Sequence, residues 1–315
     1  MAARKSKQID LRNIIIAALV LVVGVETYFL YQSNPGFREF FVRDAKSPAV
    51  PKKAVKKKPV QVPSEELMAP AAVQKPTPVP AVSVKPQRKM PAVKAHVAIV
   101  IDDWGYSTKN CEYLRSIKNP ITVAVLPDLP HSNDVMQCAH EAGKEIMLHL
   151  PMEAHNNSDE YPADYLLKTN MSPLKIDRLL TNILDKMPFV VGVNNHMGSK
   201  ATEDKTVMTT VFKQLKYRGL FFMDSRVTSK SVCASLAKQA GLPFASRDVF
   251  LDNINERGPI EESLAELARI ALKRGKALAI GHDRSLTLQV IEDKIPWFRE
   301  QGIELVTVKD YIRLK

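Results

Sequence analysis

The stretch VAIVIDDWG, residues 97–105, decides the fold of this chain. Five apolar residues, four of them β-branched, lead directly into the adjacent carboxylates of Asp102 and Asp103. A short apolar run without polar alternation predicts a strand buried on both faces, as in a parallel sheet covered by helices. The aspartates then fall at the carboxyl end of that strand, which is the edge where α/β proteins gather their functional groups.

Six further runs of the same texture follow along the chain. They are ITVAVL (121–126), EIMLHL (145–150), FVVGV (189–193), LFFMD (220–224), KALAI (276–280) and IELVTV (303–308). Amphipathic stretches with helical spacing lie between them, for example 172–187 and 203–219, the second ending at Gly219. This alternation predicts an α/β fold, a mostly parallel (β/α) barrel that is incomplete or distorted.

Polar and ionisable residues follow five of the predicted strands. The candidates are Asp102, Asp103, Trp104, His149, Glu153, Asn195, His196, Asp224, Arg226 and His282. Because the carboxyl ends of parallel strands meet at one edge of the sheet, we expect these side chains to lie close together. Taken singly, each aspartate could cap a helix and each histidine could be a core residue, so the site prediction depends on their occurring together.

The residue types at these strand ends point to metal chemistry. Two histidines and one aspartate form a nitrogen–oxygen ligand set typical of Zn²⁺ or a similar divalent ion. Adjacent carboxylates repel, so we expect one of Asp102 and Asp103 to bind a cation and the other to act as a general base. His282 is a candidate general acid, proton relay or ligand.

The N-terminal third has a different character. Basic residues in 1–13 precede the apolar run IIIAALVLVVGV (14–25), which continues to Tyr31. Segment 14–31 is close to the length of a membrane-spanning helix, and the basic flank predicts a cytoplasmic N-terminus. A cleaved signal peptide is the alternative, but ETYF (26–29) offers no small-x-small cleavage site. We therefore expect an uncleaved signal anchor.

Residues 32–94 are predicted to form a disordered tether. Ten prolines and eleven Lys or Arg residues lie between positions 45 and 94, a composition that cannot bury enough apolar surface to fold. Residues 1–94 contain 17 Lys and Arg against 6 Asp and Glu, whereas 95–315 contain 28 of each. The net charge of +11 therefore lies outside the predicted domain (95–315), and we expect no nucleic-acid partner.

The three cysteines, Cys111, Cys138 and Cys233, are widely spaced and form no C-x-x-C pattern. This spacing argues against a zinc knuckle or a dense disulfide framework. One disulfide with a leftover thiol is possible, but three small buried side chains are favoured.

At these residues the sequence resembles the divergent polysaccharide deacetylase family, a distant branch of the NodB-like carbohydrate esterases. The segments that carry the resemblance are VAIVIDDWG (97–105), AVLPDLPHS (124–132), EIMLHLPMEA (145–154), VGVNNHMGSKATED (191–204), FFMDSRVTSKS (221–231), SRDVFLDN (246–253) and ALAIGHDRSLTL (277–288). They cover nearly all of 95–310 in the order that the family has. The resemblance implies a metal-dependent, deacetylase-type domain.

The resemblance also implies roles for single residues. The aspartate pair of the family would make Asp102 the catalytic base and Asp103 a metal ligand, and the late catalytic histidine would be His282. The second motif of the family has two histidine ligands four residues apart. Here His149 is followed at that spacing by Glu153.

The departure at Glu153 leaves two ways to complete the metal set. Either Glu153 is a ligand, or His196 from the next strand end replaces it, which we favour. Asp224 would be a supporting carboxylate, and Trp104 is the candidate for stacking on a sugar. Asn195 and Arg226 would support or bind the substrate.

The resulting expectation is a protein of the inner membrane whose domain lies on the periplasmic side. It would be a metal-dependent hydrolase, with zinc as the expected ion, that removes acetyl groups from an envelope glycan. The alternative is a catalytically weak glycan-binding or scaffold protein that uses the same groove. A third possibility is an envelope assembly factor that acts through its anchor and tether. The oligomeric state stays open.

Overall fold

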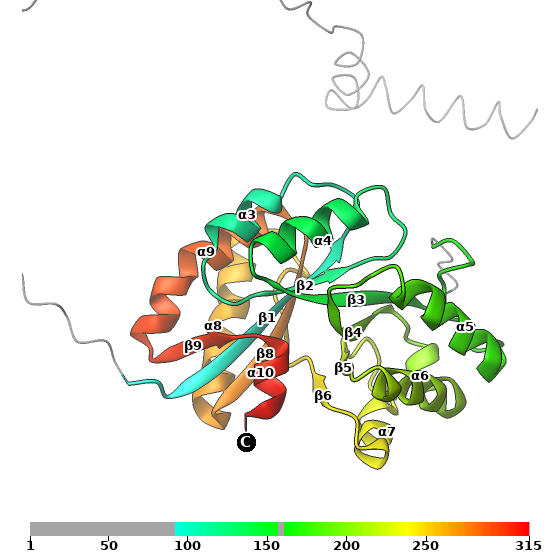
Figure 1. The fold of residues 1–315 in the computed structure, drawn as a ribbon. Helices are drawn as coiled ribbons and strands as arrows, with labels where there is room; N and C mark the ends of the chain where they lie inside the picture. Colours follow the sequence, from blue (N-terminus) through cyan, green and yellow to red (C-terminus); the bar gives the residue numbers. More distant parts are fainter. Residues whose placement is uncertain (1–91, 157–160, 315) are drawn as a thin grey trace, which may run out of the picture. The chain divides into compact units, whose positions relative to one another are not determined.

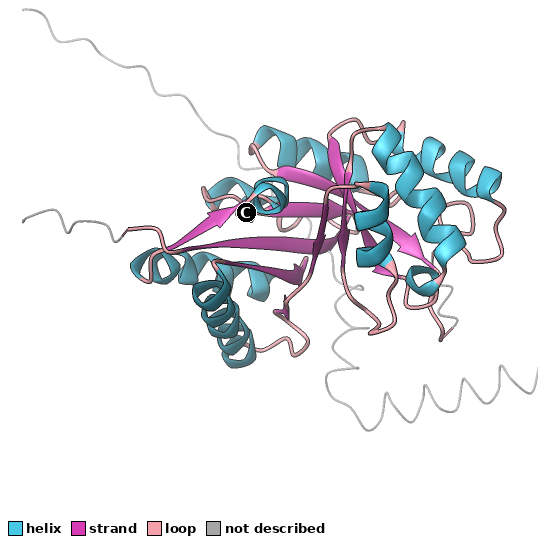
Figure 2. Ribbon diagram, turned by 90° about the horizontal axis from the view of Figure 1, so that it is seen from below, coloured by secondary structure: helices cyan, strands magenta, loops and turns pink. Residues whose placement is uncertain are grey.

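Nine strands form one parallel sheet in residues 92–156 and 161–314, which are the residues that a computed structural model describes (Figures 1 and 2). The strands are β1 (Ala95–Trp104), β2 (Thr122–Val125), β3 (Glu145–Met152), β4 (Val190–Met197), β5 (Phe221–Asp224), β6 (Phe244–Ser246), β7 (Val249–Phe250), β8 (Lys276–His282) and β9 (Ile303–Val306). Their order is β6-β5-β4-β3-β2-β1-β8-β7, and β9 also pairs with β1. Since β8 returns to β1, the sheet has the cyclic order of a barrel.

The helices pack around the curled sheet, most of them on its outside (Figure 1). They are α3 (Cys111–Ser116), α4 (Ser132–Glu141), α5 (Pro173–Leu184), the short 3₁₀ helix η1 (Ala201–Glu203), α6 (Lys205–Tyr217), α7 (Cys233–Ala240), α8 (Arg257–Arg274), α9 (Ser285–Glu300) and α10 (Val308–Arg313). Ser172 and Asp204 cap α5 and α6 by accepting hydrogen bonds from the backbone N–H groups of Lys175 and Val207. The larger apolar cluster packs between these helices and the sheet.

The barrel is incomplete at one short segment, 244–250. Its first part, β6, pairs with β5, and its last part, β7, pairs with β8. The chain changes partner at Arg247 and Asp248, whose backbone N–H groups donate to Asp224 and Leu278. The two edge strands of the sheet, β6 and β7, thus belong to one extended segment and do not pair with each other, so the barrel is only partly closed. The predicted incomplete (β/α) barrel is confirmed.

A second apolar cluster fills the inside of the curled sheet. Its members include Ala98 and Val100 on β1, Met147 on β3, and Leu278 and Ile280 on β8. Side chains alternate along a strand, so the next inward positions are Asp102, His149 and His282. The register places Asp102 directly beside His282. The polar residues are therefore the uppermost layer of the barrel interior.

The opposite end of the barrel is covered by α10. Val308, its first residue, belongs to the interior cluster. The carboxylate of Glu145 accepts hydrogen bonds from the Thr122 hydroxyl at 2.9 Å and from the Val308 N–H at 2.8 Å. Glu145 and Thr122 both lie at the amino ends of their strands, so this contact closes the end of the barrel that faces away from the polar layer.

The three cysteines are free and buried, as the sequence favoured. The predicted anchor (14–31) and almost all of the predicted tether (32–94) lie outside the described residues. Among the residues that are described, we find no helix with the length and hydropathy of a membrane span.

Candidate metal centre

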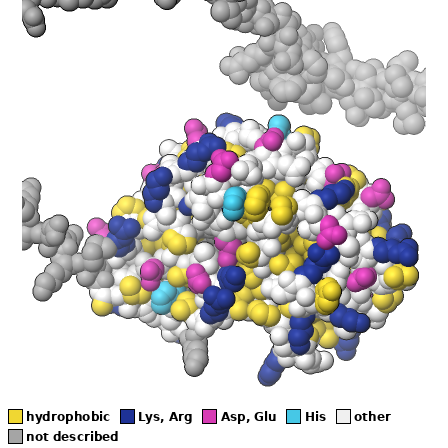
Figure 3. Space-filling view, in the orientation of Figure 1, with side chains coloured by type: hydrophobic (Ala, Val, Ile, Leu, Met, Phe, Trp, Pro, Cys, Tyr) yellow, Lys and Arg dark blue, Asp and Glu magenta, His cyan; other side chains and the backbone are white. Residues whose placement is uncertain are grey.

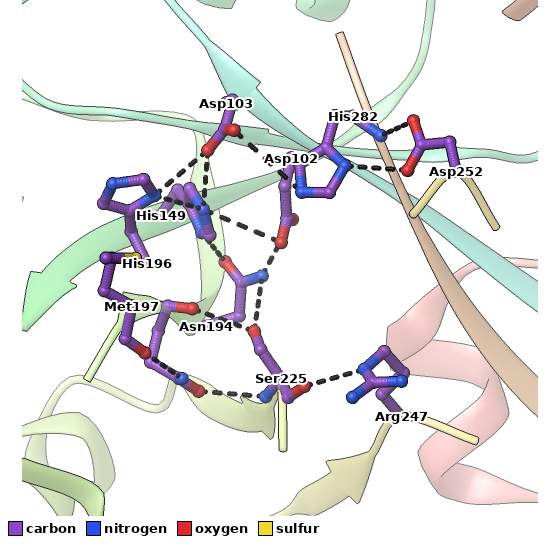
Figure 4. Close-up of polar contacts among 11 residues, drawn as sticks. Asp102, Asp103, His149, Asn194, His196, Met197, Ser225, Arg247, Asp252 and His282 are labelled. Carbon is purple, nitrogen blue, oxygen red and sulfur yellow. Dashed lines mark hydrogen bonds and ion pairs between the residues drawn. The ribbon is translucent and has the colours of Figure 1, made fainter. Parts of the chain in front are cut away.

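Asp103, His149 and His196 come together at the carboxyl ends of β1, β3 and β4 (Figure 4). Asp103 Oδ1 lies 3.1 Å from His149 Nε2 and 3.0 Å from His196 Nδ1. The two histidine nitrogens are 3.2 Å apart. These are the three residues that the sequence favoured as ligands.

The spacing of these atoms fits one small cation. A tetrahedral ion with bonds of about 2.0 Å requires ligand atoms that are about 3.3 Å apart. The three separations of 3.0–3.2 Å are close to that edge length. One oxygen and two imidazole nitrogens are also donors that Zn²⁺ accepts, and three protein ligands would leave one position for water or substrate.

A local irregularity lets both aspartates face this centre. The β1–β2 register shifts between Ile101 and Trp104, so Asp102 and Asp103 stand opposite a single residue of β2. Asp103 has a left-handed backbone conformation, with a φ of 64°. A bulge of this kind redirects a side chain that regular alternation would turn away. The adjacent carboxylates of β1 therefore both belong to the polar layer.

Left-handed non-glycine residues gather along the same edge of the sheet. Besides Asp103, they are Asp128, Met197 and Arg226, with φ values of 56°, 54° and 50°. They lie in or directly after the ends of β2, β4 and β5. Each such conformation costs on the order of 1–3 kcal/mol and tends to occur at functional sites.

Asn194 orients His149 and holds Asp102. Its side-chain oxygen lies 2.9 Å from His149 Nδ1, which fixes the Nδ1–H form and leaves Nε2 toward the centre. Its amide nitrogen donates to Asp102 Oδ1 at 2.8 Å. Asn194 is fully buried on β4. Asn194 lies in a segment that carries the family resemblance, but the sequence did not predict it as a site residue.

The charges of this layer shift one another. Burial raises the pKa of Asp102, and the nearby histidine charges offset this only in part. Burial also acts to raise the pKa of Asp103, but hydrogen bonds from His149 and His196 outweigh it and lower that pKa well below its usual range. For His149, the two carboxylates overcome burial and raise the pKa to about 9. The pKa values of the two adjacent aspartates therefore shift in opposite directions.

His282 is held by a buried carboxylate that the sequence prediction missed. Asp252 Oδ1 lies 2.7 Å from His282 Nδ1, and Asp252 Oδ2 accepts the His282 backbone N–H at 2.9 Å. The hydroxyl of Thr287 donates to the same carboxylate at 2.8 Å. Although burial alone would lower it, Asp252 raises the pKa of His282. The other ring nitrogen, Nε2, lies 4.0 Å from Asp103 Oδ2, on the side of the centre.

Glu153 lies apart from the cluster. Its carboxylate contacts Lys200 Nζ at 2.7 Å and accepts hydrogen bonds from the N–H and hydroxyl of Thr169, each at 2.6 Å. Burial would raise the pKa of Glu153, but Lys200 and Thr169 lower it to about 2. Glu153 is not among the three residues whose ligand atoms converge. Its contacts instead tie β3 to the segment that contains Thr169.

The supporting residues divide into buried and exposed ones. Asn195 links β4 to β5 by accepting the Ser225 N–H at 2.9 Å and donating to the Met197 carbonyl at 2.7 Å. Asp224 is buried and accepts hydrogen bonds from the Arg226 N–H and the Ser231 hydroxyl. Both position backbone around the layer. The Arg226 side chain is exposed.

Trp104 corrects the sequence-based prediction. Its side chain is 0% exposed and belongs to the larger apolar cluster between sheet and helices. It therefore has no face on which a sugar could stack. The bulge at Asp102 and Asp103 explains the error. In a regular strand the Trp104 side chain would point to the same side as that of Asp102, but the register shift turns it toward the helices. The exposed aromatic residue beside the layer is Tyr106.

An open groove of about 420 Å³ leads to the polar layer. Its lining includes Asp103, Tyr106, Lys109, His282 and Arg284. The face drawn in Figure 3 carries acidic and basic side chains interspersed, without a large area of one sign. The groove thus gives a polar ligand access to Asp103 and His282.

Fold and cluster together define a (β/α)-barrel protein with a histidine–aspartate centre at the carboxyl ends of its strands. A family model described as divergent polysaccharide deacetylase matches residues 99–312. The chain therefore belongs to the divergent polysaccharide deacetylase family.

Two proteins related in sequence are themselves described as uncharacterised. YibQ of Escherichia coli K12 is 33% identical over 205 residues, which are 65% of this chain and 64% of that protein. A protein of Haemophilus influenzae is 34% identical over 199 residues, which are 63% of this chain and 70% of its own length. The chain thus spans slightly less than two thirds of the E. coli relative.

A solved structure supports the fold. The uncharacterised protein ATU2773 of Agrobacterium tumefaciens C58 superposes with a TM-score of 0.66 at 24% identity. The superposition covers 72% of this chain and 92% of that one. The likeness extends to the whole described domain and concerns its architecture.

Proposed function

We propose that this chain is a metal-dependent hydrolase that removes acyl groups, acetyl in particular, from a glycan of the cell envelope. The observation that carries the proposal is the set of three ligand atoms 3.0–3.2 Å apart, beside a buried aspartate and a histidine–aspartate pair. Membership of the divergent polysaccharide deacetylase family supports a deacetylase-like role.

Asp103, His149 and His196 would hold the ion. When bound there, a divalent cation, Zn²⁺ by ligand type, would supply Lewis-acid chemistry for the hydrolysis. Asn194 would keep the imidazole of His149 in the form that presents Nε2 as a ligand. The residues thus provide both the ligands and the support that a metal site requires.

Asp102 is suited to be the general base. Its Oδ1 is held by Asn194, and its burial raises its pKa, which strengthens its tendency to take up a proton. Hydrolysis of an N-acetyl group adds water across the C–N bond and yields acetate and a free amine. Asp102 would accept the proton that the attacking water loses.

His282 is suited to be the general acid. Its Nδ1 is engaged by Asp252, so the proton that it can deliver is on Nε2, which lies toward the centre. The departing nitrogen must gain one proton to leave as an amine. His282 would give that proton, and the same arrangement would serve an ester, whose departing oxygen needs one as well.

The proposed location follows from the N-terminal sequence. Segment 14–31 would anchor the chain in the inner membrane, and the proline-rich and lysine-rich residues 32–94 would hold the domain on the periplasmic side. The substrate would then be a polymer of the envelope, which a tethered enzyme reaches by diffusion within the length of its tether.

The experiment measures bound metal and released acetate with the purified full-length chain. We expect about one divalent ion per chain and acetate release from N-acetylglucosamine oligomers or cell-wall glycan. Asp103→Ala, His149→Ala and His196→Ala should lose the metal. Asp102→Asn and His282→Gln should retain the metal and lose acetate release.

Two variants serve as matched controls. Glu153→Gln changes a carboxylate at the strand end without changing a ligand, and His131→Gln changes a partly exposed histidine of the β2–α4 connection. Both should retain metal and acetate release. A folded chain that binds no divalent ion after reloading would refute the proposed chemistry. Metal binding without acetate release from any glycan would favour a glycan-binding scaffold instead.

A further inference from the structure

The change of partner strand in segment 244–250 leaves a depression beside the polar layer. It has a volume of about 370 Å³ and is lined by Arg226, Val227, Thr228, Ser229, Arg247 and Asp248. Arg247 and Asp248 are the two residues at which the chain leaves β5 and joins β8. The other four lie in the connection that follows β5. The depression therefore occupies the point where the barrel is incomplete.

Two arginines provide the charge of this depression. Arg247 is fixed by backbone carbonyls. Its Nε donates to the Ser225 carbonyl at 2.7 Å (Figure 4), and its Nη2 donates to the Arg226 carbonyl at 3.0 Å. Arg226 is exposed and reaches the depression from a left-handed backbone conformation. Within the described residues, neither guanidinium has a carboxylate partner. Both charges are thus available to a ligand.

The acidic residues nearby are already engaged. Asp248 pairs with Arg274 at 2.9 Å and accepts the Leu278 N–H at 3.0 Å. Both oxygens of Asp224 accept hydrogen bonds, from the Arg226 N–H and from the Ser231 hydroxyl. Burial, together with the charge of Arg226, lowers the pKa of Arg247, and the charges of Asp224, Asp102 and Asp248 offset this only in part. The two positive charges therefore repel each other, and an anion between them would relieve that repulsion.

A single aromatic ring separates this depression from the polar layer. Phe250 stacks on His282 with 5.2 Å between ring centroids, and the Arg247 guanidinium lies 4.3 Å from the centroid of Phe250. The ring places Arg247 one layer away from the proposed general acid. The Arg247 guanidinium is therefore no farther from the His282 ring than these two contacts together, a span that a glycan of a few sugar residues covers, so one ligand molecule could reach both sites.

We propose that this depression is an anion subsite, and that the glycan processed at the centre carries a carboxylate or phosphate group that Arg226 and Arg247 bind. The inference rests on the proposed function in taking a glycan as the ligand. Guanidinium groups match the planar oxygens of a carboxylate or the oxygens of a phosphate with paired hydrogen bonds. Thr228 and Ser229 add polar lining. The substrate class is therefore an anionic glycan.

Binding to the full-length chain tests this subsite with three sugars. N-acetylmuramic acid carries a carboxylate, its methyl ester has the same shape without the charge, and N-acetylglucosamine lacks the whole group. We expect the acid to bind at least about fivefold more tightly than the ester. Arg226→Gln should remove that preference, and Arg226→Lys should keep part of it. Arg313→Gln, an equal loss of charge on α10 at the other end of the barrel, should leave the preference unchanged.

Inorganic phosphate distinguishes the two sources of charge. Competition by phosphate that is stronger than competition by acetate, and that Arg226→Gln abolishes, would assign a phosphorylated glycan. The reverse order would assign a carboxylated one, and either result supports the subsite. The inference fails if acid and ester bind equally and neither anion competes. If the subsite inference fails but neutral oligomers still release acetate, the hydrolase proposal stands. If the acid is preferred to the ester but no acetate is released, the subsite is supported and the hydrolase proposal is refuted.

Discussion

Asp252 determines which nitrogen of His282 faces the centre, although Asp252 itself is fully buried behind the ring. We predict that Asp252→Asn lowers the kcat of acetate release by about 10²- to 10⁴-fold, because the amide cannot hold the same protonated form of the imidazole or stabilise its charge. Metal content and KM should change little, since no ligand is altered. Steady-state kinetics with metal analysis checks this prediction.

The control for Asp252 is Asp293→Asn, which removes an equal charge from an exposed position on α9. That variant should retain wild-type kcat. If Asp252→Asn retained it too, His282 would not depend on this carboxylate, and its role as the acid would be in doubt. Loss of metal in Asp252→Asn would instead indicate a general collapse of the layer.

Glu153 provides a pH-dependent test at the same scale. Its folded pKa of about 2 lies below the ordinary value of 4.5, so its contacts stabilise the fold at pH values above about 4.5, and this contribution is lost as the pH falls toward 2. We predict that Glu153→Gln lowers the free energy of unfolding by about 1–3 kcal/mol at pH 7, allowing for the partial exposure of Lys200. Denaturant unfolding at pH 7 and pH 3 measures the difference, which should shrink at the lower pH.

A stability difference of equal size at both pH values would show that the charge of Glu153 does not matter. The matched variant is Glu203→Gln, whose partly buried carboxylate also accepts a hydroxyl hydrogen bond, from Thr228. It should destabilise the domain less, because its side chain is more exposed than that of Glu153 and its ionic partner is the exposed His155.

Some features of the site could be read from single residues, and others could not. Asp102, Asp103, His149 and His282 each end an apolar run, so the strand pattern alone places them at one edge. Asp252 follows a strand of two residues, β7, which is too short to produce a pattern. Trp104 was misplaced because a bulge breaks alternation, and bulges have no reliable sequence signal.

At the scale of elements, β4 carries a glycine that the barrel interior requires. A Cβ on Gly192 would lie 2.3 Å from the ring of Phe221, which belongs to the interior cluster. We predict that Gly192→Ala lowers the free energy of unfolding by about 1–3 kcal/mol through overpacking. The added methyl group should be tolerated better in Gly192→Ala with Phe221→Leu. Chemical denaturation of the two variants checks this.

Gly258 on α8 is the matched control, because a Cβ there would meet no atom within 4 Å. Gly258→Ala should change stability by less than about 1 kcal/mol and in the favourable direction. No loss of stability in Gly192→Ala would mean that the barrel interior has room to relax around Phe221.

Long elements followed from the sequence, and short ones did not. The seven predicted strand runs correspond to β1–β5, β8 and β9, and the two predicted helices correspond to α5 and α6 within a few residues. Periodicity identifies such elements because burial on both faces of a strand, or on one face of a helix, determines which positions along the whole element are apolar. Segment 244–250 changes its neighbouring strand halfway, and the charged residues Arg247 and Asp248 lie at that point. Each half is therefore too short to show a periodic pattern of apolar residues.

At the scale of the whole molecule, we predict that the chain sediments with membranes and resists extraction with carbonate. Deletion of 1–31 should release it into the soluble fraction while acetate release in vitro persists, because the centre lies entirely in the described domain. A reporter fused to the N-terminus should be active in the cytoplasm. Recovery of the intact chain in the soluble fraction would contradict the proposed anchor.

The two ends of the described domain lie at the same end of the barrel. Ala95 begins β1 at its amino end, and α10 closes that end through Glu145, whereas the metal centre lies at the carboxyl ends of the strands. A surface attached directly at the C-terminal end of the domain is therefore behind the barrel, and the groove opens away from it. Coupling the protein to beads or electrodes by its C-terminus should leave access for polymers as large as whole cell-wall sacculi, which a centre facing its support could not reach.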